Sequence, residues 1–144
     1  MAISQTTCTS FKVELLKAEH NFSSHTFKLA LYTSSASLGA DTTAYSTSNE
    51  ITNTSGSAYS AGGKNLTVTS TFPKSSGTTA LVDFGNVSWD SASFTARGAL
   101  IYNSSASNKA VAVLDFGSDR VANNDTFEVQ FPVSSATTAV IRIS

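Results

Sequence analysis

Alternating apolar and polar residues dominate this chain and predict β-strands. In FEVQF (127–131), Phe127, Val129 and Phe131 point one way while Glu128 and Gln130 point the other. The segments that we expect to be strands are HTFKLALYT (25–33), NLTVTSTF (65–72), TTALVDF (78–84), SFTARGALIYN (93–103), KAVAVLDF (109–116), DTFEVQF (125–131) and TTAVIRI (137–143). Their close spacing and turn-rich joints favour an antiparallel sandwich or barrel.

A helical pattern occurs once, in SFKVELLKAEHNF, and predicts a helix over 10–22. Its apolar stripe consists of Phe11, Leu15, Ala18 and Phe22, and Ser10 is the expected N-cap. Residues 1–9 then form an N-terminal arm, and the polar stretch 34–64 forms a long loop in which Tyr45, Ile51 and Tyr59 look like anchors. We therefore expect a mainly β protein: one antiparallel, jelly-roll-like β-sandwich over 1–144, with about seven or eight strands and one short N-terminal helix.

Two of the expected strands carry apolar residues on both faces. Leu100 and Tyr102 oppose Ala99 and Ile101, and the next strand repeats this pattern over Val111–Phe116. The N-terminal helix is the cover that we expect for the second face, because its own apolar stripe needs a surface to bury. Another protein subunit is the alternative cover.

The composition excludes several classes of function. The net charge is −1 and only 13% of residues are charged, which argues against a nucleic-acid partner. No apolar run is long enough to predict a membrane span. The single Cys8 excludes an internal disulfide, and MAISQTTCTS shows no secretory signal, so we expect synthesis in a reducing cytosol.

The repeated triplet DFG, at 83–85 and 115–117, resembles the metal-binding triplet of protein kinases. A kinase also needs a Gly-rich loop, a strand lysine and a catalytic-loop Asp and Asn, and these patterns are not present in the sequence. We interpret each triplet as the end of a strand, where Asp83 or Asp115 bonds turn backbone and Gly85 or Gly117 lets the chain leave the sheet.

Other candidate sites lack necessary members, so we expect no catalytic residues, no cofactor and no metal. SAGGKN departs from a phosphate-binding loop at Ala58 and Asn65. The oxygen-rich stretch from Asp115 to Asp125 could hold calcium, but its order matches no EF-hand loop. His20 and His25 lack a third ligand, and Cys8 has no neighbouring cation. Trp89 suits a core position better than an exposed sugar platform.

Several long strings resemble small virion proteins encoded in the structural modules of tailed bacteriophages. They are FKVELL, HTFKLALYTSSASLGADTTAYSTSNE, YSAGG, SWDSASFTARGALIYN and NKAVAVLDFGSD, which together span almost the whole chain. The resemblance implies a non-enzymatic β-rich component of the phage particle, foremost a capsid decoration (cement) protein that is made in the host bacterial cytoplasm. It implies the major capsid protein and other copies of the chain as partners. A tail, neck or fibre protein, or a glycan-binding module, is the alternative.

For such a protein we expect contacts through segments that the core does not require. These are the N-terminal stretch, the long loop and a free sheet edge. The candidate contact residues are Ile3, Phe11, Tyr45, Ile51, Tyr59 and, for the glycan alternative, Trp89.

Overall fold

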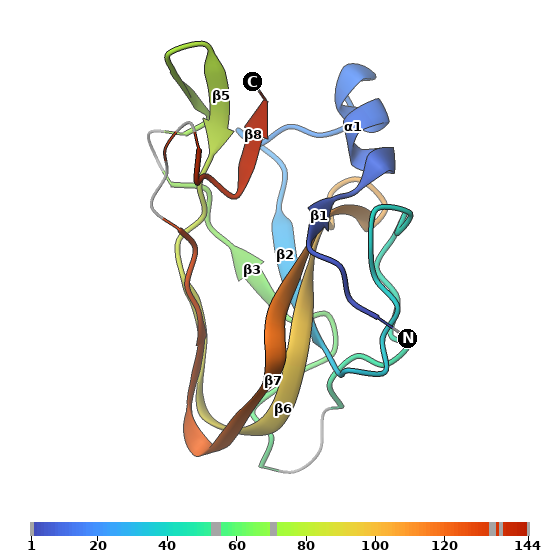
Figure 1. Ribbon diagram of the computed structural model, residues 1–144, viewed down its shortest axis with the longest axis vertical. Helices are drawn as coiled ribbons and strands as arrows, with labels where there is room; N and C mark the ends of the chain where they lie inside the picture. Colours follow the sequence, from blue (N-terminus) through green and yellow to red (C-terminus); the bar gives the residue numbers. More distant parts are fainter. Residues whose placement is uncertain (1, 53–55, 70–71, 133–134, 136, 144) are drawn as a thin grey trace.

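A computed structural model describes residues 2–52, 56–69, 72–132, 135 and 137–143. One helix, α1 (Thr9–Leu16), accompanies eight strands (Figure 1): β1 (Thr6–Thr7), β2 (Phe27–Tyr32), β3 (Lys64–Leu66), β4 (Lys74–Ser76), β5 (Thr79–Val82), β6 (Val87–Asn103), β7 (Lys109–Val129) and β8 (Ile141–Ile143). The strands form antiparallel sheets of order β1-β7-β6-β2-β3 and β4-β5-β8. The expected fold class, mainly β and sandwich-like with a short N-terminal helix, is confirmed.

The central element is a long, bent hairpin made of β6 and β7, which lies within the five-stranded sheet. In Figure 1 the paired strands run down one side of the molecule, bend at the lower end and rise on the other side. The pairing passes from Ala96↔Arg120 to Gly98↔Asp115, so four residues of β7, 116–119, lie opposite the single residue Arg97 of β6. Extra residues in one strand of a pair bend it and increase its twist.

This bend corrects the interpretation of the second DFG triplet. The segments KAVAVLDF and DTFEVQF are parts of the single strand β7, which does not end at Asp115. Gly117 has φ +83° and lies within the extra residues of the bend, where its backbone freedom turns the strand without ending it. The first triplet agrees better with the prediction, because β5 ends at Val82, directly before Asp83.

The hairpin turn predicted at SSASN is confirmed. It joins Asn103 to Lys109, with Ser107 and Asn108 in left-handed backbone conformations. The alternation predicted for FEVQF is confirmed as well, since Phe127 and Val129 are buried while Glu128 and Gln130 are exposed.

The helix is shorter than predicted and begins earlier. Cys8 is the N-cap residue in place of Ser10, whose hydroxyl instead donates to the carbonyl oxygen of Thr42. At the other end Ala18 adopts φ 62°, its N–H bonds to Leu15 O and the N–H of Glu19 bonds to Glu14 O. These two bonds form the Schellman motif, which commonly ends helices and usually has a glycine in the left-handed conformation. Because this chain has an alanine there, the sequence carries no signal for the helix end.

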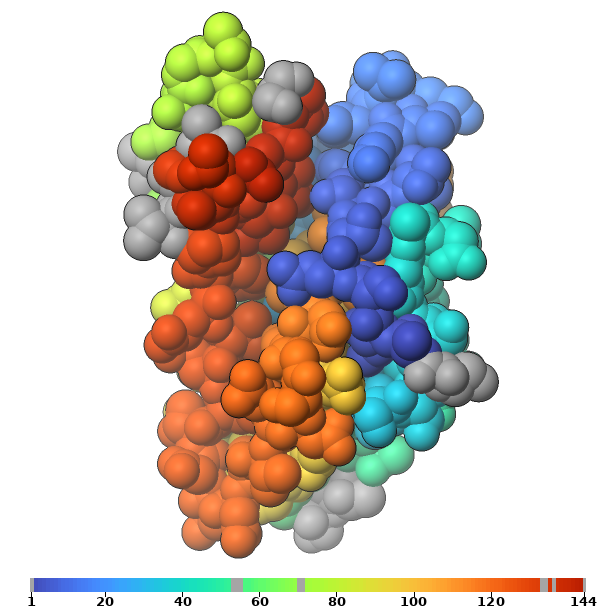
Figure 2. Space-filling view, viewed as in Figure 1, coloured from blue at the N-terminus to red at the C-terminus, as the bar shows by residue number. Residues whose placement is uncertain are grey.

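Both faces of the apolar hairpin segment are buried by the chain itself. Leu100, Ile101, Val111 and their neighbours are inaccessible to solvent. The covering elements include α1, as expected, and also the N-terminal arm and the long loop, which pairs with the hairpin at Ala44↔Lys109. The space-filling view shows the N-terminal segment (blue) on one side of a recess and the C-terminal segment (red) on the other (Figure 2).

The segment from 34 to 63 contains no strand in its described part, as expected for a loop, but it is packed closely. Its anchors are confirmed: Ile51 and Tyr59 are buried and Tyr45 is half-buried. The backbone of Glu50 pairs with Tyr32 at the end of β2, and Ile51 N–H bonds to Leu31 O. The loop is therefore part of the core structure; residues 53–55 lie outside the described part.

Candidate functional site: an open groove and two buried polar clusters

The residues expected to form a contact surface lie in the core. Ile3, Phe11, Ile51, Tyr59 and Trp89 all have side chains in the main hydrophobic cluster, and Tyr45 is half-buried against it. Five of the six are therefore buried within the chain and present little surface to a partner, whereas a contact through Tyr45 stays a prediction. An anchor that holds a loop and a residue that binds a partner have the same apolar character in a sequence, and only burial separates them.

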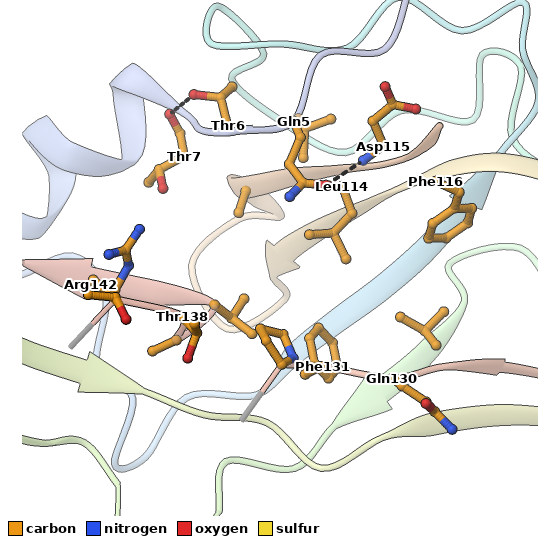
Figure 3. A pocket seen from close by; sticks show the side chains of 17 residues that line it. Gln5, Thr6, Thr7, Leu114, Asp115, Phe116, Gln130, Phe131, Thr138 and Arg142 are labelled. Carbon is orange, nitrogen blue, oxygen red and sulfur yellow. Dashed lines mark hydrogen bonds between the residues drawn. The ribbon is translucent and has the colours of Figure 1, made fainter. Parts of the chain in front are cut away.

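An open groove lies between the N-terminal arm, the inner part of β7 and the C-terminal segment (Figure 3). Its volume is about 690 Å³. Its lining is mixed: Thr6, Thr7 and Gln130 are polar, whereas Leu114 and Phe131 are apolar. The side chain of Gln5 reaches across the rim and accepts the N–H of Asp115 at 3.1 Å, which satisfies one donor on the open edge of β7.

Four large apolar side chains are exposed in the described part of the chain. They are Val13 and Leu16 on α1, Val121 at the bend of the hairpin, and Ile143 on β8. Leu16 is 91% exposed, the most of the four. In Figure 1, α1 and β8 lie at the upper end of the molecule, and the bend of the β6–β7 hairpin lies at the lower end. The exposed apolar surface is thus divided between two opposite ends.

The first buried polar cluster surrounds the carboxylate of Glu50, which is only 6% exposed. It accepts the hydroxyl of Tyr59 at 2.5 Å, the hydroxyl of Tyr45 at 2.7 Å and the N–H of Gly62 at 2.8 Å. The Tyr59 oxygen in turn accepts the N–H of Leu31 at 3.0 Å. Three donors satisfy a charge that would be costly to bury alone. They join the middle of the long loop to its C-terminal end, and Tyr59 links this cluster to β2.

The same cluster raises the pKa of tyrosine side chains. Burial is the largest cause for Tyr59 and Tyr45, and the hydrogen bond that each donates to Glu50 is the second. The pKa of Tyr102 is raised to about 12, by burial first and by the negative charge of Glu50 second. Its hydroxyl donates to Gly62 O at 2.7 Å. These phenols therefore act as neutral donors over the physiological pH range.

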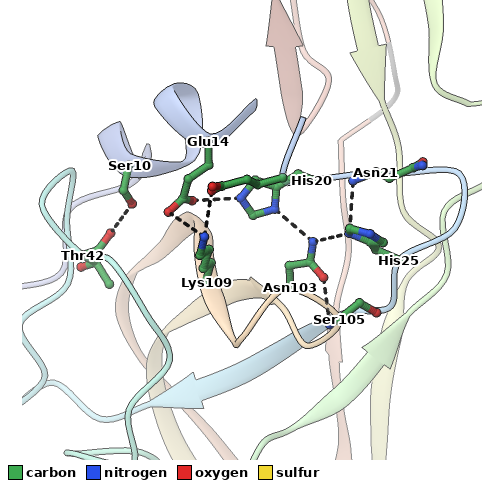
Figure 4. A network of polar contacts seen from close by, with 10 residues as sticks. Ser10, Glu14, His20, Asn21, His25, Thr42, Asn103, Ser105 and Lys109 are labelled. Carbon is green, nitrogen blue, oxygen red and sulfur yellow. Dashed lines mark hydrogen bonds and ion pairs between the residues drawn. The ribbon is translucent and has the colours of Figure 1, made fainter. Parts of the chain in front are cut away.

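The second polar cluster joins the segment after α1 to the tip of the central hairpin (Figure 4). Asn103 is fully buried, and its amide nitrogen lies 3.0 Å from His20 Nδ1 and 2.9 Å from His25 Nδ1. His20 Nε2 lies 3.0 Å from Glu14 Oε1. The imidazole of His20 packs against Phe11, with ring centroids 4.9 Å apart. The two histidines, which the sequence leaves without a shared partner, are thus brought together by an asparagine.

An ion pair borders this cluster at the surface. Lys109 Nζ lies 2.8 Å from Glu19 Oε2 and 4.0 Å from Glu14 Oε2. The hydrogen bond from Lys109 lowers the pKa of Glu19, and the same bond raises the pKa of Lys109. Each side chain is about one-third accessible to solvent, so water screens the pair, and we expect it to orient the turn more than it stabilises the fold.

The aspartates of the DFG triplets bind backbone or nearby side chains. Asp115 Oδ1 accepts the N–H of Gly117 at 2.9 Å, which confirms the predicted turn bond, and lies 3.4 Å from Arg97 Nε. Asp83 Oδ2 instead accepts the hydroxyl of Thr69. Among the residues that the structure describes, no three His, Cys, Asp or Glu side chains come together as a metal site, and this includes the stretch Asp115–Asp125.

Trp89 and Cys8 are both core residues. Trp89 is 1% exposed and packs near Tyr59, Phe94 and Phe127, which confirms its predicted core position. Its indole N–H has no hydrogen-bond partner within the described part of the chain. The thiol of Cys8 is fully buried, and burial raises its pKa to about 11, with smaller contributions from Glu14 and Asp41. A raised pKa keeps the thiol protonated and chemically unreactive.

Sequence reasoning missed Glu50 and Asn103, the centres of the two polar clusters. Glu50 is the single acidic residue between Asp41 and Asp83, in a stretch rich in Ser and Thr, and this isolation next to the apolar Ile51 is a usable signal. Asn103 gives no such signal, because its partners lie 78 and 83 residues away in the chain.

Comparison with family models, curated proteins and solved structures gives no match to this chain. The one helix in the described ranges, α1, is too short to cross a membrane.

Proposed function

We propose that this chain is a non-enzymatic structural component of a bacteriophage particle, a capsid decoration protein that binds and stabilises the assembled shell. The observation that carries the proposal is the position, in the fold, of the sequence strings that resemble virion proteins. SWDSASFTARGALIYN lies in β6, and NKAVAVLDFGSD spans the turn and the inner part of β7. Two of the resembling strings therefore make up most of the central β6–β7 hairpin, and the others lie in α1, β2 and the long loop.

The surface supports a binding role of this kind. Both faces of the apolar hairpin are closed by the chain, so a partner meets edges, the open groove and the exposed side chains at the two ends. With a net charge of −1, long-range attraction contributes little. Contacts of modest strength suffice when many copies bind one symmetric shell. The partners in this proposal are the major capsid protein and other copies of this chain, and the location is the virion.

The burial of the aromatic residues argues against the glycan-binding alternative. A sugar platform requires exposed rings, but Trp89, Tyr32, Tyr59 and Tyr102 are at most 2% exposed. Tyr45 is half-buried and stacks on Tyr102 with ring centroids 4.6 Å apart. A tail, neck or fibre location is treated as an outcome of the test below.

The proposal is tested with particles of the phage that encodes the chain. Particles made without the protein should bind purified protein at regular positions on the head, visible by electron microscopy, and should then resist heating better. Binding at the tail or neck would move the protein to the alternative location. Absence of the protein from purified particles, together with no binding of added protein, would overturn the proposal.

Three matched substitutions test which end of the molecule contacts the particle. Leu16→Glu and Ile143→Glu place a charge on the end that carries two of the exposed apolar residues, and Val121→Glu places the same charge on the opposite end. Each side chain is more than half exposed, so the fold should tolerate the change. We expect the first two variants to bind particles more weakly and Val121→Glu to bind normally. The reverse result would assign the contact to the bend.

A further inference from the structure

The orientation of the Asn103 amide follows from its surroundings. The backbone N–H of Ser105 lies 3.0 Å from Asn103 Oδ1 and can only donate, so the amide oxygen must face it. The amide nitrogen, which can also only donate, therefore faces the two histidines (Figure 4). Asn103 is the last residue of β6, and this arrangement starts the turn 104–108.

The two histidines must then present lone pairs at Nδ1. His20 Nδ1 accepts one hydrogen of the Asn103 amide, and its proton lies on Nε2, which donates to Glu14 Oε1. His25 Nδ1 accepts the second amide hydrogen and lies 3.2 Å from the backbone N–H of Asn21. Every group around both Nδ1 atoms is a donor, so the network is complete only when both imidazoles are neutral.

A proton on either Nδ1 would place two donors against each other inside the protein. Rotation of the Asn103 amide by half a turn would offer its oxygen to the histidines, but the NH₂ group would then oppose the N–H of Ser105. No orientation of this amide satisfies both Ser105 and a protonated Nδ1. A buried donor without an acceptor is costly, so protonation must loosen one side of the network.

The charged groups near the imidazoles do not remove this conflict. Glu14 of α1 favours a positive His20, but its bond to Nε2 exists already in the neutral state, and its other oxygen lies 4.0 Å from Lys109 of β7. Glu19 is held by Lys109 at 2.8 Å. The imidazole of His20, with a fully buried side chain, also packs against the rings of Phe11 and Phe27, which offer no acceptor for a further N–H.

We propose that Asn103, His20 and His25 form a pH-sensitive latch, which holds the segment after α1 to the tip of the central hairpin and releases it when the imidazoles take up protons. The released contacts would include the bonds beside the latch, in which Ser104 N–H donates to Thr26 O and Thr26 N–H donates to Ser105 Oγ. Its consequence is a local opening at the end of the molecule that carries α1. This inference is independent of the proposed function.

The first test follows the wild-type chain by NMR between about pH 8 and about pH 5, the range in which histidine side chains exchange protons. The ring nitrogens should show the Nε2–H tautomer for both histidines at the upper end. As they become protonated, hydrogen-exchange protection of the Ser105 and Thr26 amides should fall by roughly fivefold to tenfold relative to amides in the middle of β6. Unchanged protection with protonated histidines, or an Nδ1–H tautomer in the neutral state, would overturn the latch.

The second test inverts the latch with Asn103→Asp. A carboxylate at this position accepts the N–H of Ser105 and also accepts Nδ1–H from a protonated histidine, so protonation should now strengthen the network. We expect acidification over the same range to lower the melting temperature of the wild type and to leave that of Asn103→Asp unchanged or higher. Parallel pH profiles for the two proteins would contradict the proposal. If the variant does not fold, the wild-type NMR measurement decides alone.

Discussion

Ile3 lies directly against Gly98 at the bend of the central hairpin. A Cβ built on Gly98 would lie 2.9 Å from both Cδ1 and Cγ2 of Ile3 and 2.6 Å from the carbonyl oxygen of Leu114. The N-terminal arm therefore closes over the bend only because this position has no side chain. The contact links the arm, which comes first in the chain, to the two central strands of the five-stranded sheet.

Gly98→Ala should destabilise the protein by about 1 to 3 kcal/mol, since the Leu114 carbonyl belongs to the paired backbone and cannot move away. Gly85→Ala is the matched control, because a Cβ there would meet only Thr67 O, at 3.9 Å. Denaturant unfolding of the two variants checks the difference. Equal stabilities would show that the arm and the bend adjust freely.

Removal of the Tyr59 hydroxyl should cost more than removal of the Tyr45 hydroxyl. Tyr59→Phe deprives buried Glu50 of a donor and leaves the N–H of Leu31 without its acceptor, with an expected cost of about 1.5 to 3 kcal/mol. Tyr45→Phe removes one bond at a half-buried position and should cost about 1 kcal/mol or less. Chemical denaturation measures both. A larger cost for Tyr45→Phe would contradict the central place of Tyr59 in the cluster.

The four tyrosines should ionise only as the protein unfolds at alkaline pH. Tyr32, Tyr45, Tyr59 and Tyr102 all have raised pKa values, in each case chiefly through burial. Because the folded pKa lies above the unfolded value of about 10, their contribution to stability is complete below that pH and declines as the pH rises above it. Phenolate absorbance and far-ultraviolet circular dichroism should therefore change together. A phenolate signal that precedes the loss of structure would contradict this.

Cys8 should resist thiol reagents in the folded protein. Its side chain is fully buried, so reagents cannot reach it, and its pKa is raised to about 11, so the reactive thiolate is scarce at neutral pH. Ellman's reagent should react at once with the denatured chain and only slowly with the native one, at a rate that follows opening of the structure. Rapid labelling under native conditions would show that the helix start opens readily.

The fluorescence of Trp89 should report a buried indole. The emission maximum should lie at short wavelength, because the ring is 1% exposed and its N–H has no described hydrogen-bond partner. Acrylamide should quench the native protein weakly and the denatured protein strongly. Strong quenching in the native state would restore the exposed sugar platform as a candidate.

Features that depend on residues close together in the chain can be predicted from the order of the amino acids. Alternation predicted the strands, including Phe127 and Val129 facing inward, and the turn-rich SSASN between two apolar runs predicted the hairpin. Trp89 was predicted as a core residue because a large apolar ring stabilises most when it is buried. These features follow from local geometry, in which side chains two residues apart share a face of a strand.

Where these elements meet is seen only in the folded chain. That β7 continues through Asp115 depends on pairing with β6, and extra residues at 116–119 bend a strand that its glycine was expected to end. The burial of Ile3 depends on Gly98, 95 positions later in the chain. Glu50 and Asn103 became the centres of polar clusters because folding brought distant donors and acceptors around them. Such contacts join residues far apart in the chain and form only when the whole core closes, so no local pattern of residues predicts them.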